Sequence, residues 1–274
     1  MLHTPPWVRF HDAGRLHFLW EDAARSASEL GSDTQAAPVL RTAARIAPRA
    51  RLALAVALAE WIVWRFEGLH TRTEPAAFVE SAWCATADPR YLRTFELLRA
   101  DWRGPVEGPL WCALTRLGHA LSMGVDFPRH IYEGLAYLTR LALHVQPTSG
   151  PFLAWLPLVL DRLALVYPAL PEDPFVADLF PADPVSRMGP WVPREVFDLA
   201  IPFDGNTGRS FLEGVLATAR REGNPFLATP QELAAARFMG KPYELERLAT
   251  PELSERVRVR QSRAAAAAAA LGGR

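Results

Sequence analysis

Lysine is almost missing from this sequence, because Lys241 is the only lysine among thirty basic side chains in 274 residues. Isoleucine and asparagine are also scarce, whereas alanine, arginine, proline and glycine are abundant. Such biases follow codon content, and they indicate a bacterial genome rich in G and C. They carry no information about a reaction.

Cysteine is nearly as rare, and Cys84 and Cys112 are the only two. Two thiols are too few for a disulfide framework or for a zinc site built on cysteine. We therefore expect both side chains to be reduced.

The chain also lacks an excess of charge of either sign, because thirty acidic side chains balance thirty basic ones. A neutral protein has no overall field that would draw it to nucleic acid or to an anionic membrane. The composition therefore argues against both as partners.

Hydrophobic runs long enough to cross a membrane are missing as well. The longest run, Leu52–Trp64, would form a helix of about 20 Å, against about 30 Å for the hydrocarbon core of a bilayer. Residues 1–12 lack the uninterrupted apolar stretch of a secretory signal. We expect a cytoplasmic protein.

What the chain has in abundance is apolar helix-forming sequence, and Arg51–Phe66 is the clearest stretch. Glu60 is the only ionisable residue between its flanking arginines, so a helix here is apolar on nearly every side and belongs in a protein interior. A buried carboxylate costs several kcal/mol unless it is paired. We expect an arginine from a neighbouring helix as the partner of Glu60, with a catalytic role as the alternative.

Helical periodicity extends over residues 12–170, with short breaks that contain residues typical of helix ends. Thr73 or Glu74 before Pro75, and Ser149 or Gly150 before Pro151, each place a cap ahead of a helix-starting proline. We count about eight helices, joined by short loops. The pattern predicts an all-α fold, either a multi-helix bundle or stacked helical hairpins, and no fixed repeat period distinguishes the two.

The sequence changes character after residue 170. Seven prolines fall between Pro171 and Pro202, a stretch that we call the strap, and they are mixed with aromatic residues. Proline stops helices, whereas the aromatic residues argue against plain disorder. We expect a helical core over residues 1–170, the strap and short helices packed on it over residues 171–253, and a fraying Arg/Ala-rich tail helix over residues 254–274.

A stripe of polar side chains marks the helix expected over residues 127–145. The members of this stripe are His130, Glu133, Tyr137, Arg140 and His144, which fall on one face. His130 and Glu133 lie one turn apart, as metal ligands or an acid/base pair would. The alternative is the solvated edge of a largely buried helix, which is the usual role of a charged stripe.

A metal site needs more than this pair. A catalytic zinc takes three protein ligands, and a di-iron bundle repeats its Glu-x-x-His motif, whereas His130-x-x-Glu133 occurs once. His119, Asp126 and Glu107 are the nearest candidates in sequence for a third ligand. Because this set is incomplete, we predict no metal and no other cofactor.

Two features favour binding to another protein. Strap aromatics can anchor on a partner or on the protein's own helices, and tail arginines spaced i, i+4 and i+7 can meet an acidic partner or remain solvated. The residues concerned are Phe175, Phe180 and Trp191 in the strap and Arg256, Arg260 and Arg263 in the tail.

The leading hypothesis is therefore a non-enzymatic bacterial helical protein that binds another protein, as an adaptor or a neutralising partner. The absence of a catalytic motif does not exclude catalysis, because motifs transfer poorly between folds. The alternative is an all-helical enzyme or small-ligand binder with a pocket lined by His, Glu and Tyr. The candidate pocket residues are His119, His130, Glu133, Tyr137 and His144, with Glu60 and Trp64 on a facing helix.

Overall fold

The computed structural model describes residues 2–10, 14–22, 30, 32–93, 95–124, 128–146, 150–169, 188–201, 212–217, 223–235, 258–259 and 262. Within these residues the fold is all-α, with two isolated β-bridges and no strand, so the predicted fold class is confirmed. The longer helices are α2 (Ala37–Ala43), α3 (Pro48–Arg65), α4 (Glu74–Ala87), α5 (Gly104–Met123), α6 (Arg129–Val145), α7 (Pro151–Val166) and α9 (Pro230–Ala235). Short 3-10 helices are η1 (Asp33–Ala36), η2 (Pro89–Tyr91), η3 (Arg99–Asp101) and η5 (Arg194–Phe197).

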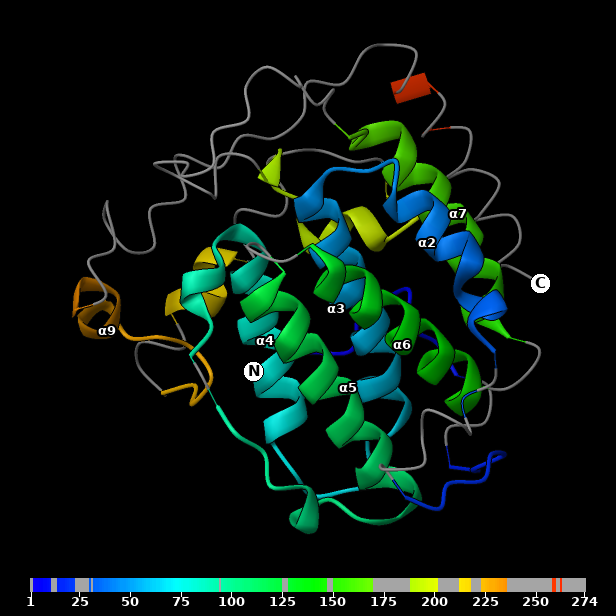
Figure 1. Cartoon of the computed structure of the whole chain (residues 1–274), viewed down its shortest axis with the longest axis vertical. Helices are drawn as coiled ribbons and strands as arrows, with labels where there is room; N and C mark the ends of the chain where they lie inside the picture. The colour runs from blue at the N-terminus through cyan, green and yellow to red at the C-terminus, as the bar shows by residue number, and fades with distance from the viewer. Residues whose placement is uncertain are drawn as a thin grey trace.

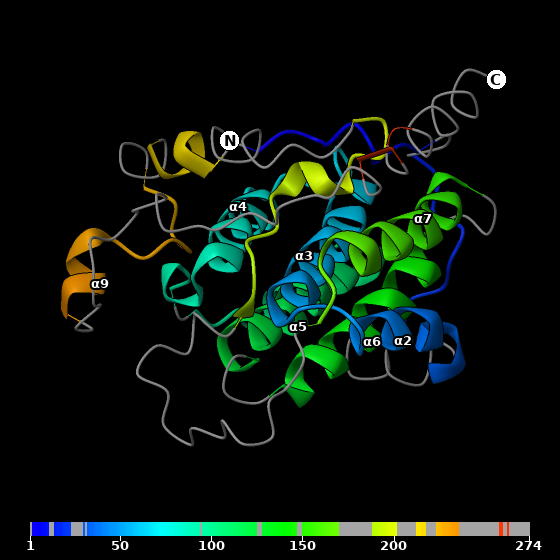
Figure 2. The same cartoon turned by 90° about the horizontal axis from the view of Figure 1, so that it is seen from above.

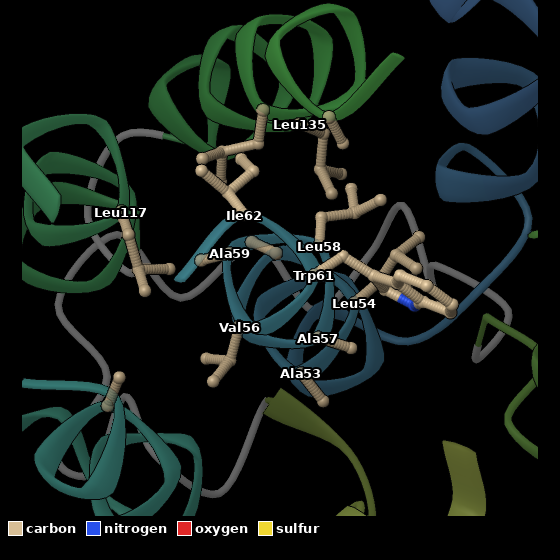
Figure 3. Packing of buried hydrophobic residues seen from close by; sticks show 14 of the residues in the cluster. Ala53, Leu54, Val56, Ala57, Leu58, Ala59, Trp61, Ile62, Leu117 and Leu135 are labelled. Atoms are coloured by element: carbon tan, nitrogen blue, oxygen red, sulfur yellow. The ribbon is translucent and has the colours of Figure 1, made fainter. Parts of the chain in front are cut away.

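Helix α3 is the centre of the bundle, and it contacts α4, α5, α6 and η5 (Figure 1). Its side chains are buried on every side, as Figure 3 shows for Leu58 and Ile62, which point toward Leu135 of α6, and for Val56, which points away from them. A helix surrounded by other segments has no solvent-exposed face, which explains why the sequence of α3 is apolar on every side. Because the other helices surround α3, the core is a bundle and not a stack of hairpins.

Prolines set the beginnings of several helices. Pro48, Pro75 and Pro151 lie in the first turns of α3, α4 and α7, where a missing amide donor costs little. Of the two candidates at each break, Thr73 and Gly150 occupy the cap positions of α4 and α7, and the Thr73 side chain makes no capping hydrogen bond. Helix α3 consequently starts at its proline, slightly earlier than the periodicity indicated.

The helical structure predicted from residue 12 onward is wrong for residues 14–22. The described residues before η1, which we call the amino-terminal arm (residues 2–10 and 14–22), form no helix. Figure 2 shows the arm in blue, running over the bundle as irregular chain. Its Phe10 and Phe18 pack edge-on against aromatic rings near the end of α3, with centroids 5.8 and 6.0 Å apart. These aromatic residues pack on the bundle one at a time, and their spacing in the sequence resembled the periodicity of a helix.

The strap is described from residue 188 to 201, and its remaining residues lie outside the described part. This strap segment (188–201) packs on the bundle through η5, and buried arginines of the helices hold its backbone. Arg49 of α3 donates to the carbonyl of Gly189 at 2.8 Å. Arg162 of α7 donates at 2.8–2.9 Å to three strap carbonyls, those of Val196, Asp198 and Ile201.

A second, smaller apolar cluster joins the end of α4 to later parts of the chain. It consists of Cys84, Ala87, Tyr91, Trp191, Leu212, Val215, Leu216, Leu227, Ala228 and Leu233. Helix α9 begins with a capping box, in which the Glu232 amide donates to Thr229 Oγ1 at 3.2 Å and the Thr229 amide donates to Glu232 Oε2 at 2.7 Å. The residues after the strap therefore dock on one end of the bundle.

Among the described helices, none has the length and apolar character needed to cross a membrane.

Candidate functional site

Glu60 lies in the interior of the bundle, fully buried, and faces η5 of the strap segment. Arg194 Nη2 donates to Glu60 Oε1 at 2.6 Å, and Arg194 Nε donates to Oε1 and Oε2 at 3.1 and 3.2 Å. The indole of Trp64 donates to Oε1 at 3.3 Å. The arginine expected beside Glu60 is therefore present, and the strap supplies it.

Arg194 also ties the amino-terminal arm to this pair. Its Nη2 donates to the His3 carbonyl at 2.9 Å, and its guanidinium carbon lies 5.3 Å from the centroid of the Trp7 ring. Arm, strap and α3 thus meet at one guanidinium group. Because this group and the segments around it cover Glu60, a substrate could reach the carboxylate only after they moved, which favours the structural role.

Electrostatics around this pair are dominated by burial. Burial raises the pKa of the Glu60 carboxyl, while the charge and hydrogen bonds of Arg194 act in the opposite direction. The Trp83 indole acts in the same direction as Arg194, although it lies outside hydrogen-bonding geometry. Burial also raises the pKa of Glu195, and the negative charges of Glu60 and Asp198 add to this effect. Several carboxylates thus crowd around the strap segment, so the Arg194 charge is important there.

The polar stripe on α6 is divided between different environments. His130 and Glu133 pair with each other, with 3.3 Å between Nδ1 and Oε2, and the Glu133 side chain is 62% exposed. Tyr137 is buried, and the Arg116 guanidinium lies 4.8 Å from the centroid of its ring. His144 packs against the arm, where its Nε2 lies 2.8 Å from the Leu19 carbonyl oxygen. The stripe consequently does not converge on one reacting centre.

A cleft of about 390 Å³, the α5 cleft, lies between α5 and the extended residues that lead to η3. One wall is the stretch Leu92–Leu97, in the part that the structure describes. The other wall is a single face of α5 that consists of Trp111, Thr115, Gly118, His119 and Ser122. Of the pocket residues proposed from sequence, His119 is the one that lines this cleft.

Close contacts at two points fix the walls relative to each other. The Trp111 indole donates to the Leu97 carbonyl at 2.8 Å and closes one end. Farther along, a Cβ atom on Gly118 would lie 3.0 Å from Phe95 Cζ, so the glycine allows the aromatic ring to approach α5. Phe95 is held from behind by Phe78 and Phe226, with ring centroids 4.7 and 5.2 Å away. The floor of the cleft is therefore packed and apolar.

The backbone of the extended wall is only partly satisfied. At its beginning, the Arg93 amide donates to the Phe226 carbonyl at 2.8 Å, next to the bridge between Leu92 and Leu227. By contrast, the amides of Phe95–Leu98 donate to no other described residue. Trp111 satisfies the Leu97 carbonyl, but those of Phe95 and Glu96 accept no hydrogen bond within the described chain. Backbone groups without a partner in the protein can pair with another chain.

Ionisable groups in the cleft differ in their partners. Arg93 Nη2 donates to Glu232 Oε2 of α9 at 2.9 Å, and this bond together with those from Thr229 lowers the pKa of Glu232 to about 2. Glu96 is exposed, and neither it nor His119 has a hydrogen bond or ion pair with another described residue. One carboxylate and one imidazole thus remain open to a ligand.

Sequence reasoning missed the extended wall of this cleft. Phe95 and Glu96 stand in a short stretch without a motif, and their importance depends on a fold that places them beside α5. The available signal was Gly118 on the apolar face of α5, since a glycine inside a helix often marks a close approach.

Of the six residues predicted to bind a partner, Trp191 is the one that lies within the described part of the chain. Trp191 is 3% exposed and belongs to the second apolar cluster. The other five, Phe175, Phe180, Arg256, Arg260 and Arg263, lie outside the described residues, so their role stays a prediction.

Metal and thiol chemistry find little support in the residues that the structure describes. Among them, no group of three or more His, Cys, Asp or Glu side chains could hold a metal ion. Cys84 and Cys112 are buried and form no disulfide, and burial raises the pKa of the Cys84 thiol. A thiol held in this way is a poor nucleophile.

The fold is an all-α bundle with an open, partly apolar cleft along α5. Comparison of the chain with protein-family models, curated proteins and solved structures finds no match.

Proposed function

We propose that this protein is a non-enzymatic binding protein of a bacterial cytoplasm, an adaptor or a neutralising partner, and that the α5 cleft receives an extended segment of another protein. One observation carries the proposal: a cleft of about 390 Å³ runs beside backbone amides that have no partner within the described residues. The composition, poor in lysine and with two cysteines that form no disulfide, supports the cellular setting.

An extended segment fits this wall better than a helix would. Strand addition satisfies open main-chain groups, while pockets beside the strand select alternate side chains. The chain supplies its own example, because residues 224–228 already pair with the beginning of the same wall. A partner would continue this pairing along Phe95–Leu98.

A binding role also agrees with the state of the polar groups in the cleft. The Ser122 hydroxyl donates to the Gly118 carbonyl of its own helix at 2.8 Å. A nucleophilic serine would instead need a base within about 2.6–3.2 Å, and His119 makes no hydrogen bond to a described residue. This arrangement supports recognition over nucleophilic catalysis as the role of these groups.

Selection from a random heptapeptide library on the whole protein tests the proposal. Thr115→Trp fills the cleft, and His119→Trp does so from an exposed position that tolerates a larger side chain. Ala154→Trp, on the exposed face of α7, adds the same side chain elsewhere. Peptides selected on the unaltered protein should lose at least about tenfold in affinity for the cleft variants and keep it for the control. Equal affinity for all variants would exclude the α5 cleft.

A small ligand is the second candidate, because the cleft volume falls within the range of roughly 300–1,000 Å³ found for such sites. His119 and Thr115 would then supply polar contacts beside the apolar surface of Trp111. A small molecule that binds the unaltered protein and Ala154→Trp, but neither cleft variant, would favour this candidate if the library gave no peptide.

A further inference from the structure

We propose that the segment bound in the α5 cleft carries a basic side chain, which Glu96 recognises. This inference rests on the proposed function and adds the charge of the ligand to it. It comes from the balance of charges along the cleft walls.

Arg93, Glu96 and His119 are the ionisable residues among those that line the cleft. The charge of Arg93 is offset by Glu232, with 2.9 Å between Nη2 and Oε1. The acidic group among the lining residues is the Glu96 carboxylate, which has no ion pair with another described residue.

Nearby arginines do not compensate Glu96. Arg116 precedes His119 by one turn on α5, but its guanidinium lies over the Tyr137 ring and it is not among the lining residues. Arg99 faces Asp22, with 4.0 Å between Nη1 and Oδ1. A ligand that brings its own cation therefore complements the cleft, whereas an acidic ligand meets repulsion.

The apolar part of the ligand follows from the same walls. Phe95, Leu97 and Trp111 form an apolar surface next to the exposed Glu96. In an extended segment successive side chains point to opposite sides, so an apolar residue can contact this surface while its neighbour meets Glu96. The favoured ligand class is an extended segment that alternates apolar and basic residues.

Library selections on charge variants test this inference. The same random heptapeptide library is selected on the unaltered protein, on Glu96→Gln and on Glu96→Lys, with Thr115→Trp and His119→Trp to define cleft-dependent peptides. Glu96 is exposed, so its substitution should leave folding intact, which the midpoint of urea unfolding checks. Glu213, exposed on residues 212–217, gives the matched control Glu213→Lys.

We expect lysine and arginine to exceed aspartate and glutamate about fivefold among the cleft-dependent peptides of the unaltered protein, since an exposed charge pair contributes up to about 1 kcal/mol. This preference should vanish for Glu96→Gln, reverse for Glu96→Lys, and persist for Glu213→Lys.

The two proposals fail in different ways. If no peptide depends on the cleft, the proposed function is wrong and this inference falls with it. If cleft-dependent peptides show no basic preference, or the preference survives in Glu96→Lys, the binding function stands and the role of Glu96 is wrong.

Discussion

Two irregular stretches of this chain lie on the helical bundle, and they differ in how their polar groups are satisfied. In the strap segment, Arg49 and Arg162 donate to backbone carbonyls, and Arg194 neutralises the buried Glu60. In Phe95–Leu98, the amides have no partner within the described residues. Both stretches are irregular, but the protein satisfies backbone groups of the strap segment and leaves the amides of Phe95–Leu98 without a partner among the described residues. We call the first the closed region and the second the open region.

The difference indicates which stretch is structural and which is free to bind. Buried polar groups are almost always satisfied in folded proteins, and the arginines do this for the strap segment. Polar groups left open at a surface are satisfied by water and can exchange water for a partner at little cost. The strap segment should therefore be needed for stability, and the stretch beside α5 for binding.

Removing the cation from the closed region should have the largest effect. Arg194→Met leaves Glu60 buried without its charge partner, so we expect a loss of about 3–5 kcal/mol in the free energy of unfolding. Urea denaturation measures it. The double variant Glu60→Met with Arg194→Met should recover most of the loss, because it removes both charges. A loss below about 1 kcal/mol in the single variant would contradict the structural role of the pair.

Loss of the Arg162 guanidinium should come next in size. Arg162→Met removes the donor to three carbonyls of the strap segment, and we expect about 2–4 kcal/mol of destabilisation in the same assay. Arg162→Lys keeps the charge but not the planar fork, and it should recover only part of this loss. Full stability in the methionine variant would show that the strap needs no such support.

Substitution of Glu195 should increase the free energy of unfolding, in contrast to the two arginine variants, and the increase should depend on pH. Its folded pKa is raised, so its protonated form favours folding at low pH, and this contribution is lost as the pH rises through the folded pKa. Glu195→Gln should therefore stabilise the protein by up to about 1 kcal/mol at pH 7, after allowance for solvent screening, and leave it unchanged near pH 4. Thermal unfolding at both values measures this. Destabilisation at pH 7 would mean that the carboxylate has a partner it needs.

The smallest effect belongs to the cap of α9. Thr229→Ala removes the hydroxyl that accepts from the Glu232 amide, and we expect a local loss of about 0.5–1 kcal/mol, seen as faster hydrogen exchange in residues 230–235.

The depressed pKa of Glu232 implies that its bonds to Arg93 and Thr229 stabilise α9 above pH 4.5 and are lost as the pH falls toward about 2. If the exchange rates in residues 230–235 change neither with Thr229→Ala nor with the fall in pH, the bonds of Thr229 and Glu232 do not stabilise α9.

Local signals predicted the helices, and non-local contacts decided the rest. Pro75 and Pro151 start helices in the structure as their own chemistry requires. The burial of Glu60 also followed from its apolar neighbours. Its partner Arg194 did not, because that contact depends on where a segment 134 residues away crosses α3.

The candidate site was harder to predict for the same reason. His119 was selected from the sequence and does line the α5 cleft. Glu96 and Phe95 were not, since their exposed charge and their contact with α5 exist only in the fold. Around Phe18, the helical spacing found over residues 12–170 came from rings that pack singly on the bundle, which periodicity cannot distinguish from a helix.

Hydrogen–deuterium exchange on the whole chain, with and without a cleft-dependent peptide from the library, tests the central contrast most directly. In the free protein the amides of residues 95–98 should exchange fast, and those of Val196, Asp198 and Ile201, which are hydrogen-bonded, should exchange slowly. Peptide should protect residues 95–98 and leave the strap segment unchanged. Fast exchange in the strap segment, or protection that appears there and not at residues 95–98, would contradict this account.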